Sequence, residues 1–502
     1  MDGKNKNQSN MEDKSAMNFL IYTFVLCSYL TLCTARDTMR HGDRILGDAM
    51  ENNTLISAGG KFELGFFTLN ESGSDEIRTY VGIWYHKFSP KTIVWVANRT
   101  DPLLKSSGVF RIAEDGNLQI LDDTTGKSYW STCLEKSSSS SNRSVTLMDT
   151  GNLELRENSN GQWAMRSLWE SFLDPTDTFL PGMKMDENFK LTSWKDEGNP
   201  ETGAFCFTQD HKRENRYVVM NDLVPYWKSG EAGTFFGSAK MPDSILNLLS
   251  NIISNPKVYF GMRLVIKSDG TIQYLKWDER KKAWSLLWWE PRDKCGVFMA
   301  CGNFGSCNSK NRLTCKCLPG FKPKSPGKWN LGDFFGGCNR GKELCVEKNT
   351  KFLRLKMMKV DDPDSGGLPV DNETECRNKC LGDCLCQAYS FQPPDKSISQ
   401  RRDSGHPNTS LCWTWRESLN NLQEDYARGR EIFARVVSSD IGDFKATSTE
   451  STSRNCEPCG TTMIPYPLST RPDCGDPLYF SFRCDNNSTG RVSSRHPAVN
   501  TK

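Results

Sequence analysis

The sequence has few of the features on which most enzymes and nucleic-acid-binding proteins depend. It holds only 5 histidines in 502 residues, and its net charge is +3 because 64 Lys and Arg nearly balance 61 Asp and Glu. Such a balance provides no broad attraction for nucleic acid. No G-x-S-x-G elbow, H-E-x-x-H motif, phosphate loop or protein-kinase signature occurs. We therefore predict no enzyme activity, no cofactor, no metal and no nucleic-acid partner for the residues present.

Long apolar runs are also scarce. The one candidate, Phe19–Cys33, spans about 15 residues, whereas a membrane helix needs about 20. Ala35 follows at a spacing typical of signal-peptide cleavage, so we predict a signal peptide at 1–35 and a secreted, extracellular (apoplastic) chain. An uncleaved anchor is the alternative. No membrane span is predicted after residue 35. Cleavage removes Cys27 and Cys33 and leaves 18 cysteines, an even number that suits an oxidising compartment.

Glycosylation sequons agree with secretion. The pattern N-x-S/T marks surface positions that receive N-glycans in secreted proteins. It predicts glycans at Asn52, Asn70, Asn98, Asn142, Asn372, Asn408, Asn486 and Asn487.

Cysteine and tryptophan are distributed unevenly along the chain. Residues 1–294 contain 4 cysteines and 11 tryptophans, and residues 295–502 contain 16 cysteines and 3 tryptophans. The first part can build aromatic cores, whereas the second is typical of domains held by disulfides. Zinc is the competing use of closely spaced cysteines such as Cys456 and Cys459. With so few histidines in a secreted chain, disulfides are favoured.

The first part reads as short strands and turns. Apolar runs at 80–85 and 92–97 predict buried strands. The turn Asp115-Gly116-Asn117-Leu118 recurs as Thr150-Gly151-Asn152-Leu153, and a weaker copy, Asp269-Gly270-Thr271-Ile272, joins a predicted hairpin. Regularly spaced short strands indicate an all-β barrel or prism.

Several motifs of this region resemble a known family. FELGFF at 62–67, YVGIWY at 80–85, IVWVANR at 93–99 and WESF at 169–172 resemble the bulb-type lectin domain of plant S-domain receptor kinases and S-locus glycoproteins. The S-locus glycoprotein region of the same family is matched by WKSG and DKCG, at 227–230 and 293–296.

The cysteine-rich part resembles two further modules. The spacing of six cysteines is that of an EGF-like module, and the resemblance implies the pairs Cys295–Cys307, Cys301–Cys315 and Cys317–Cys338. The next six resemble a PAN/apple module, which implies Cys380–Cys386 and Cys376–Cys412 and leaves Cys345–Cys384. Within this module, Asn372 is predicted to cap a short helix, with Glu375 as its reciprocal partner and Gly382 near its end. The pairing of Cys133, Cys206 and the last four cysteines stays open.

The resemblance implies a mainly β, multidomain protein with tandem β-prism (bulb lectin-like) domains followed by disulfide-rich EGF-like and PAN/apple modules. The expected order is a signal peptide at 1–35, a bulb-type lectin domain at 36–165, an S-locus glycoprotein region at 166–291, an EGF-like module at 292–340, a PAN/apple module at 341–437, a Ser/Thr-rich linker at 438–455 and a truncated galacturonan-binding-like segment of wall-associated-kinase type at 456–502.

Sugar binding by the lectin domain is less well supported. Mannose-binding bulb lectins use the pattern Q-x-D-x-N-x-V-x-Y, and the best copy here keeps two of the five residues, Asp115 and Asn117. Each missing hydrogen-bond partner removes about 1 kcal/mol or more from a weak site. These two residues are therefore weak sugar-binding candidates, and a packing turn is the alternative.

The resemblance predicts a non-catalytic recognition ectodomain of an S-domain receptor-like kinase, here truncated or secreted; pollen recognition is the family's named role. Its expected ligand is an extracellular peptide, lipid or cell-wall glycan. Its expected protein partner is a co-receptor or a second copy of the chain, bound through the PAN module. The alternatives are a secreted mannose-type defence lectin and a fragment of a full-length membrane serine/threonine receptor kinase.

Overall fold

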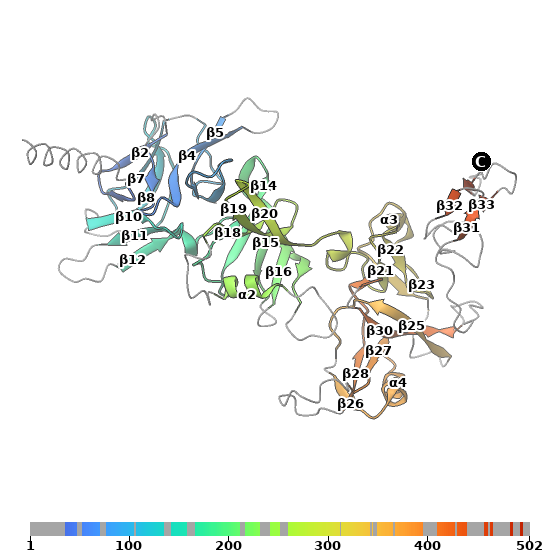
Figure 1. Cartoon of the computed structure of the whole chain (residues 1–502). Coiled ribbons are helices and arrows are strands. Elements are labelled where there is room, and N and C mark those ends of the chain that lie inside the picture. The colour runs from blue at the N-terminus through green and yellow to red at the C-terminus, as the bar shows by residue number, and fades with distance from the viewer. Residues whose placement is uncertain are drawn as a thin grey trace, which may run out of the picture. The chain divides into compact units, whose positions relative to one another are not determined.

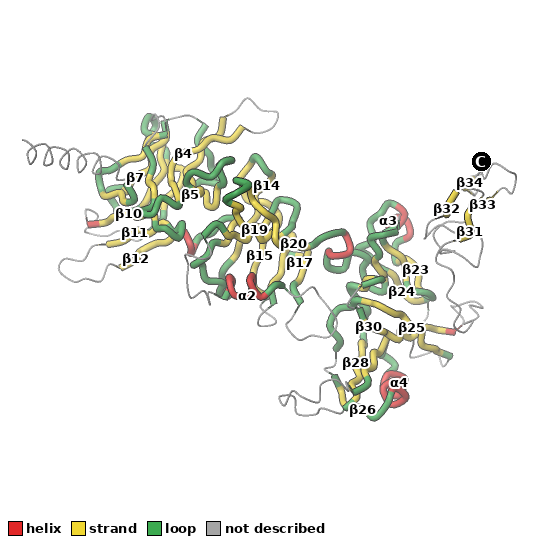
Figure 2. Tube along the Cα trace, in the orientation of Figure 1, coloured by secondary structure: helices red, strands yellow, loops and turns green. Residues whose placement is uncertain are grey.

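The computed structural model describes residues 36–47, 53–70, 77–104, 107–134, 142–157, 166–210, 216–230, 241–250, 260–311, 313–341, 344, 349–364, 367–394, 409–426, 429–438 and four short strands beyond residue 455. Strands outnumber helices throughout (Figure 2), as predicted for a mainly β chain. Unit one comprises Met1–Tyr226 with Met241–Glu290, and unit two comprises Trp227–Lys240 with Pro291–Lys502. The predicted signal peptide lies outside the described residues.

Three four-stranded antiparallel sheets form the first domain of unit one (Figure 1, blue to cyan). Their strands, in sheet order, are β3 (Leu55–Ile56), β4 (Phe62–Asn70), β5 (Ile77–Tyr85) and β6 (Ile93–Val96); β2 (Arg44–Leu46), β7 (Gly108–Ile112), β8 (Leu118–Asp122) and β9 (Ser128–Ser131); and β1 (Thr38–Arg40), β10 (Arg143–Leu147), β11 (Leu153–Glu157) and β12 (Arg166–Glu170). The first three strands of the chain each join a different sheet, so the N-terminal segment ties the sheets together. This arrangement is a prism, one of the two predicted architectures.

Three tryptophans meet where the sheets converge. Trp95, Trp130 and Trp169 come from β6, β9 and β12, the last strand of each sheet. Their ring centroids are 5.7–5.9 Å apart in T-shaped pairs. Such pairs contribute about 0.5–1.5 kcal/mol beyond the area that they bury. The three tryptophans therefore pack the last strands of the three sheets against one another.

The repeated turn forms the same hairpin each time. In the first copy, Ala113 N donates to Asn117 O and Gly116 N donates to Ala113 O, and the other two copies repeat both bonds. The glycine has a positive φ in every copy, +84°, +89° and +82° in order. Only glycine adopts this conformation without strain, and it completes a turn whose twist matches the flanking strands. The predicted repeat is confirmed as a structural one.

Among the described residues, the second domain of unit one contains two four-stranded sheets and one short α-helix, green in Figure 1. The predicted hairpin is present as two paired antiparallel strands. The elements, in chain order, are β13 (Thr178–Phe179), β14 (Lys190–Asp196), β15 (Asn199–Gln209), β16 (Tyr217–Asn221), β17 (Val224–Lys228), α2 (Asp243–Leu249), β18 (Met262–Ile266), β19 (Ile272–Asp278) and β20 (Ala283–Glu290).

An aromatic cluster joins the two domains of unit one. Phe88, just after β5, stacks on Trp277 of the second domain, with 4.1 Å between ring centroids. Tyr85 lies 5.3 Å from Trp284, whose indole Nε1 donates to Thr92 Oγ1 at 3.0 Å. Because these rings pack against each other, the two domains form one compact unit.

The EGF-like region of unit two is held by three disulfides. They join Cys295 to Cys307, Cys301 to Cys315 and Cys317 to Cys338, the pairs that the resemblance implies. Its described strands and α-helix are all short, namely β21 (Gly305–Cys307), β22 (Cys315–Cys317), β23 (Phe321–Pro323), α3 (Pro326–Asn330) and β24 (Cys338–Arg340). The bridges replace a core that so small a segment cannot bury.

The PAN-like region combines one five-stranded sheet with α4 (Glu373–Gly382). The sheet contains β25 (Thr350–Met358), β30 (Arg430–Val437), β27 (Ala388–Gln392), β28 (Ser410–Trp415) and β26 (Leu368–Val370), in that order. Asn372 Oδ1 accepts from Glu375 N at 3.0 Å, which confirms the predicted helix cap. The Glu375 carboxylate accepts in return from the backbone N–H of Asp371, at 2.8 Å, and not from that of Asn372.

Disulfides attach this helix to the sheet and its neighbouring loop. The structure joins Cys376 to Cys412 and Cys380 to Cys386, again the pairs implied by the resemblance. Cys384 is also disulfide-bonded, and its expected partner, Cys345, lies outside the described residues.

The EGF-like and PAN-like regions share a core, which the sequence does not reveal. Leu318 and Phe321 of the first pack in one cluster with Trp415, Leu422 and Ile432 of the second. Strand β21 also pairs in parallel with β29 (Leu422–Gln423). The two regions are therefore parts of one packed body.

The tail beyond residue 455 is described only as two strand pairs. These are β31 (Cys456–Cys459) with β32 (Thr462–Ile464) and β33 (Phe482–Cys484) with β34 (Val492–Ser494). Cys459 is disulfide-bonded. The predicted linker lies outside the described residues, apart from Ser438.

Candidate functional site

The candidate sugar-binding residues Asp115 and Asn117 lie together in the turn between β7 and β8. Asn117 is 4% exposed. Its Oδ1 accepts from Thr132 Oγ1 at 2.8 Å and from Leu134 N at 2.6 Å, and its Nδ2 donates to Leu134 O at 3.3 Å. The amide therefore ties the turn to the segment that follows β9. A sugar hydroxyl at this position has to compete with these internal bonds.

Asn152, the second copy of the same position, plays a similar part. Its Oδ1 accepts from Ser171 Oγ and Phe172 N, at 3.2 and 3.1 Å. Its Nδ2 donates to carboxylate oxygens of Glu154 and Glu170, at 3.1 and 2.9 Å. In both copies the asparagine fastens the last strand of its sheet to the turn. This geometry favours the packing role that the sequence left open.

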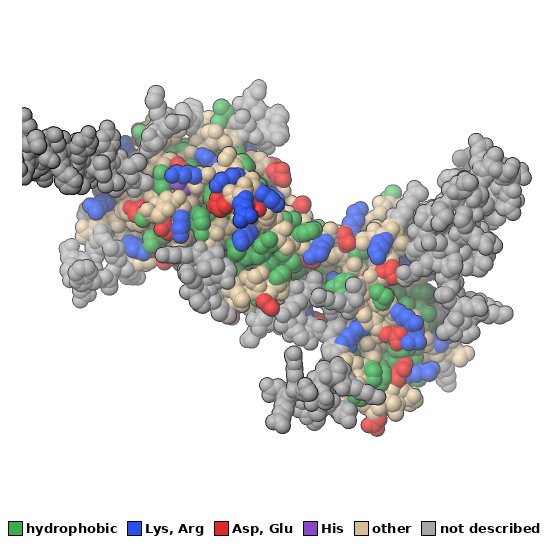
Figure 3. All heavy atoms as spheres, viewed as in Figure 1, with side chains coloured by type: hydrophobic (Ala, Val, Ile, Leu, Met, Phe, Trp, Pro, Cys, Tyr) green, Lys and Arg blue, Asp and Glu red, His purple; other side chains and the backbone are tan. Residues whose placement is uncertain are grey.

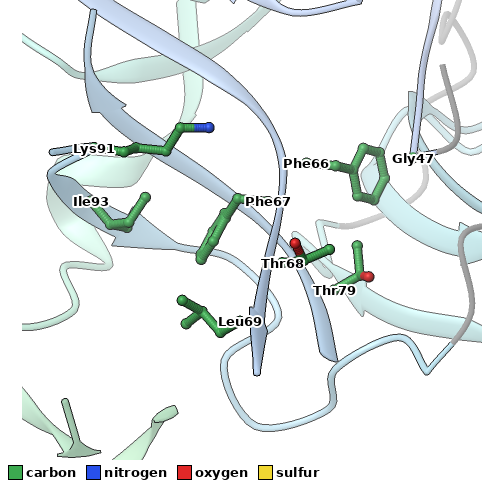
Figure 4. Close-up of a pocket in the computed structure, with 8 residues that line it drawn as sticks. All are labelled: Gly47, Phe66, Phe67, Thr68, Leu69, Thr79, Lys91 and Ile93. Atoms are coloured by element: carbon green, nitrogen blue, oxygen red, sulfur yellow. The ribbon is translucent and has the colours of Figure 1, made fainter. Parts of the chain in front are cut away.

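A cavity of about 420 Å³ opens on the sheet β3–β6 of the first domain of unit one (Figure 4). Phe67, Leu69 and Ile93 lie on one side of β4 together with Lys91, and Phe66 lies on the other side. Lys91 Nζ lies 3.9 Å from the centroid of the Trp84 ring, a cation–π contact. The lining of the cavity thus combines apolar side chains with two threonines and one lysine. Phe66, Phe67 and Ile93 belong to motifs noted in the sequence, but those motifs predict buried strands and give no sign of a cavity.

Surface side chains of both signs are interspersed, without one dominant charged face in the view of Figure 3. This agrees with the balanced composition. In the described part of the chain, no helix is long and apolar enough to span a membrane.

One predicted glycosylation site is at odds with the structure. Asn98 is 1% exposed, and its Nδ2, the atom that carries an N-glycan, donates to Thr79 O and Asp101 O at 3.3 and 3.2 Å. Its Oδ1 accepts from Val81 N at 2.9 Å. A glycan on this nitrogen cannot be accommodated in the fold, so the prediction for Asn98 is corrected. The sequon pattern failed here because it contains no information on burial.

The other sequons are less constrained. Asn372 is exposed, and because its cap bond uses only Oδ1, a glycan on Nδ2 is compatible with the cap. Asn142 is partly exposed. Asn70 is described only as the last residue of β4. Asn52, Asn408, Asn486 and Asn487 lie outside the described residues. Glycosylation at these seven positions stays a prediction.

Three cysteines of the EGF-like region lie close enough together to raise the question of a metal site. The sulfurs of Cys301, Cys307 and Cys315 lie within 4.8 Å of one another. All three are already in disulfides, which leaves no thiolate to bind a metal. Cys133 and Cys206 are free thiols, the first exposed and the second buried. Burial raises the pKa of the Cys206 thiol, which makes it less reactive.

Three families match successive parts of the chain. The D-mannose binding lectin family matches residues 92–195, the S-locus glycoprotein domain matches 235–325 and the PAN-like domain matches 345–422. This is the order expected from the sequence motifs.

Individual relatives extend the match over most of the chain. A G-type lectin S-receptor-like serine/threonine-protein kinase of Arabidopsis thaliana is 44% identical over 421 residues, which are 81% of this chain and 47% of that protein. The S-locus-specific glycoprotein S6 of Brassica oleracea is 30% identical over 454 residues, which are 86% of this chain and 98% of that protein. The chain thus spans about half the length of its kinase relatives and nearly the whole of this glycoprotein.

Proposed function

The chain belongs to the family of S-locus glycoproteins and G-type lectin S-receptor-like kinases, and from this membership we propose that it is a non-catalytic extracellular recognition protein. The observation that carries the proposal is the near-complete coverage of an S-locus glycoprotein by this chain, which itself matches the lectin, S-locus glycoprotein and PAN-like families in succession. The disulfide-linked regions fit an oxidising compartment. Recognition would use loops and cavities on rigid β scaffolds.

Secretion is part of this proposal and has its own test. The chain is expressed in plant cells with and without residues 1–35. We expect only the chain that is made with residues 1–35 to reach the medium. The protein recovered from the medium should have lost these residues by cleavage. Retention of the full chain in the membrane fraction would instead indicate an uncleaved anchor.

Binding is tested on the secreted chain with panels of small peptides, lipids and cell-wall oligosaccharides. We expect saturable binding of one class of ligand, lost after reduction of the disulfides under conditions that unfold unit two or after thermal unfolding of unit one.

The absence of catalysis is tested with a phosphotransfer assay that uses ATP and a generic protein substrate. Phosphotransfer by the purified chain would contradict the proposal.

The PAN-like region is proposed to mediate self-association or co-receptor contact. Leu381 and Leu385, at and after the end of α4, are 37% and 48% exposed, and Leu368 of the neighbouring β26 is 41% exposed. Three exposed leucines in one module support a protein contact there. Analytical ultracentrifugation tests self-association: Leu385→Glu is expected to weaken the dimer at least tenfold, and a wild-type chain that stays monomeric at 100 μM, roughly the range of weak interfaces, would refute self-association and leave co-receptor contact as the proposed role.

A second candidate function is carbohydrate binding. It is supported by the match of residues 92–195 to D-mannose binding lectins, although Asn117 is engaged internally. A glycan array distinguishes the two functions. A mannose signal that Asp115→Ala abolishes would support the lectin function, whereas no signal above background would remove it.

A further inference from the structure

A second cavity in unit one lies where the two β domains meet. It encloses about 290 Å³, close to the lower limit of small-ligand pockets. Arg78, Arg99 and Asp101 line it from the first domain, and Asn199 and Glu201 line it from the second. The sequence gives no hint of this cavity, because its two walls lie about a hundred residues apart along the chain.

Arg99 brings a partly uncompensated positive charge to this cavity. Its Nε, Nη1 and Nη2 donate to the backbone oxygens of Pro200, Thr192 and Ser193, at 2.7, 3.1 and 2.6 Å. A guanidinium group has five N–H donors, so two are left beyond these bonds. Within the described part of the chain, no carboxylate lies at ion-pair distance from Arg99. Burial lowers the pKa of this side chain, and more distant carboxylates only partly oppose the effect.

Asn199 adds a buried donor that the protein itself does not satisfy. The residue is 2% exposed, and its Oδ1 accepts from Glu201 N at 3.0 Å. Its Nδ2 is buried and has no hydrogen-bond partner among the described residues. An unsatisfied buried donor costs about 1–3 kcal/mol. An acceptor oxygen placed in the cavity would recover part of this cost.

The two carboxylates of the lining are already neutralised. Asp101 lies 3.4 Å from Lys127 Nζ, and Glu201 accepts a hydrogen bond from Lys195 Nζ at 2.8 Å. This bond lowers the pKa of Glu201, so the carboxylate is ionised and paired. The Arg99 guanidinium group therefore tips the charge of the cavity lining toward positive. Leu104, which is 55% exposed, adds an apolar surface at the same cavity.

We propose that this interdomain cavity binds the carboxylate of a ligand about the size of one sugar or amino-acid residue. The carboxylate accepts from the remaining Arg99 donors and from Asn199 Nδ2, while the apolar surface at Leu104 contacts the body of the ligand. Planar guanidinium groups suit carboxylates because two parallel bonds can form. The inference rests on the proposed recognition function, since it names the chemical class of a ligand.

The test uses the full secreted chain and two pairs of probes. D-galacturonate is compared with D-galactose, and N-acetyl-L-leucine with its neutral amide, by isothermal titration calorimetry or ligand-observed NMR. We expect one acid to bind at least tenfold more tightly than its neutral counterpart, and the acid that does so identifies a sugar or a peptide as the source. Equal binding of acid and neutral probe, or no binding of either acid at millimolar concentration, would overturn the proposal.

Two isosteric variants assign the binding to this cavity. Asn199→Asp keeps the oxygen that accepts from Glu201 N but replaces the unsatisfied donor with an acceptor, so acid binding should fall at least tenfold. Glu201→Gln removes a negative charge from the lining and should strengthen acid binding by a factor of two or more. Melting curves establish that both variants are folded. Unchanged acid affinity in both contradicts the assignment. If both acids fail while the chain still binds a member of the larger panels, the cavity inference alone is wrong.

Discussion

The buried Asn98 side chain leads to a sharp prediction, because the same residue is a glycosylation sequon. Its amide connects the end of β6 to backbone atoms of Thr79 and Val81 on β5, and to Asp101 O. Asn98→Ala removes all three bonds and leaves Val81 N and Asp101 O without a partner, whereas Thr79 O keeps the bond from Leu103 N. At about 1–3 kcal/mol for each orphaned group, we expect the free energy of unfolding of unit one to fall by about 3 kcal/mol or more.

The matched control is Thr100→Ala, which destroys the sequon without touching the Asn98 amide. Thr100 is exposed, so this change should alter stability by less than about 0.5 kcal/mol. A loss of about 3 kcal/mol lowers the melting temperature of a domain of 150–250 residues by roughly 6–12 °C. Calorimetry of the secreted variants measures the difference, and intact-mass and peptide analysis show whether Asn98 carries a glycan. A glycan at Asn98, or equal stability of the two variants, would refute the reasoning.

Three further perturbations test other parts of the structure. Arg99→Met removes three bonds to backbone carbonyls and should destabilise unit one by about 3 kcal/mol in urea titrations, whereas a loss under about 1 kcal/mol would show that these bonds are dispensable. Leu422→Ala creates a cavity in the shared core of unit two; we expect a cost of about 2–5 kcal/mol and one common calorimetric transition for the EGF-like and PAN-like regions, and two separate transitions would contradict the shared core. Burial raises the pKa of Asp177 more than nearby arginines lower it, so stability should fall as pH rises above about 4; Asp177→Asn should flatten this fall in denaturation series at pH 4–7, and an unchanged slope would exclude Asp177 as its source.

Local patterns in the sequence were sufficient to predict the short-range elements of the structure. The turn repeat, the hairpin around Gly270 and the Asn372 cap depend on residues within a few positions of one another, so their chemistry is visible in the sequence itself. The five disulfides in the structure that were implied by the resemblance also depend on regular spacing. Such features are fixed before long-range packing is known.

Long-range contacts set the limits of prediction. Arg99 donates to carbonyls 93–101 residues later in the chain, and the EGF-like region joins the PAN-like region through residues such as Ser306 and Glu424, 118 positions apart. Nothing in the spacing of apolar or charged residues encodes these pairings. For the same reason the sequence did not predict that the Asn98 side chain is buried, because a sequon is defined by only three residues.

The segment that carries part of the family resemblance, Ile93–Arg99, turns out to be a joint between domains. Trp95 Nε1 donates to Asp174 O at 2.8 Å, Asn98 fastens β5, and Arg99 holds three carbonyls of the second domain. None of these side chains matches the mannose-binding pattern. The segment therefore indicates the paired arrangement of two β domains more directly than it indicates sugar binding. Because Arg99 also lines the interdomain cavity, the contacts that hold the domains together position a guanidinium group where a ligand can reach it.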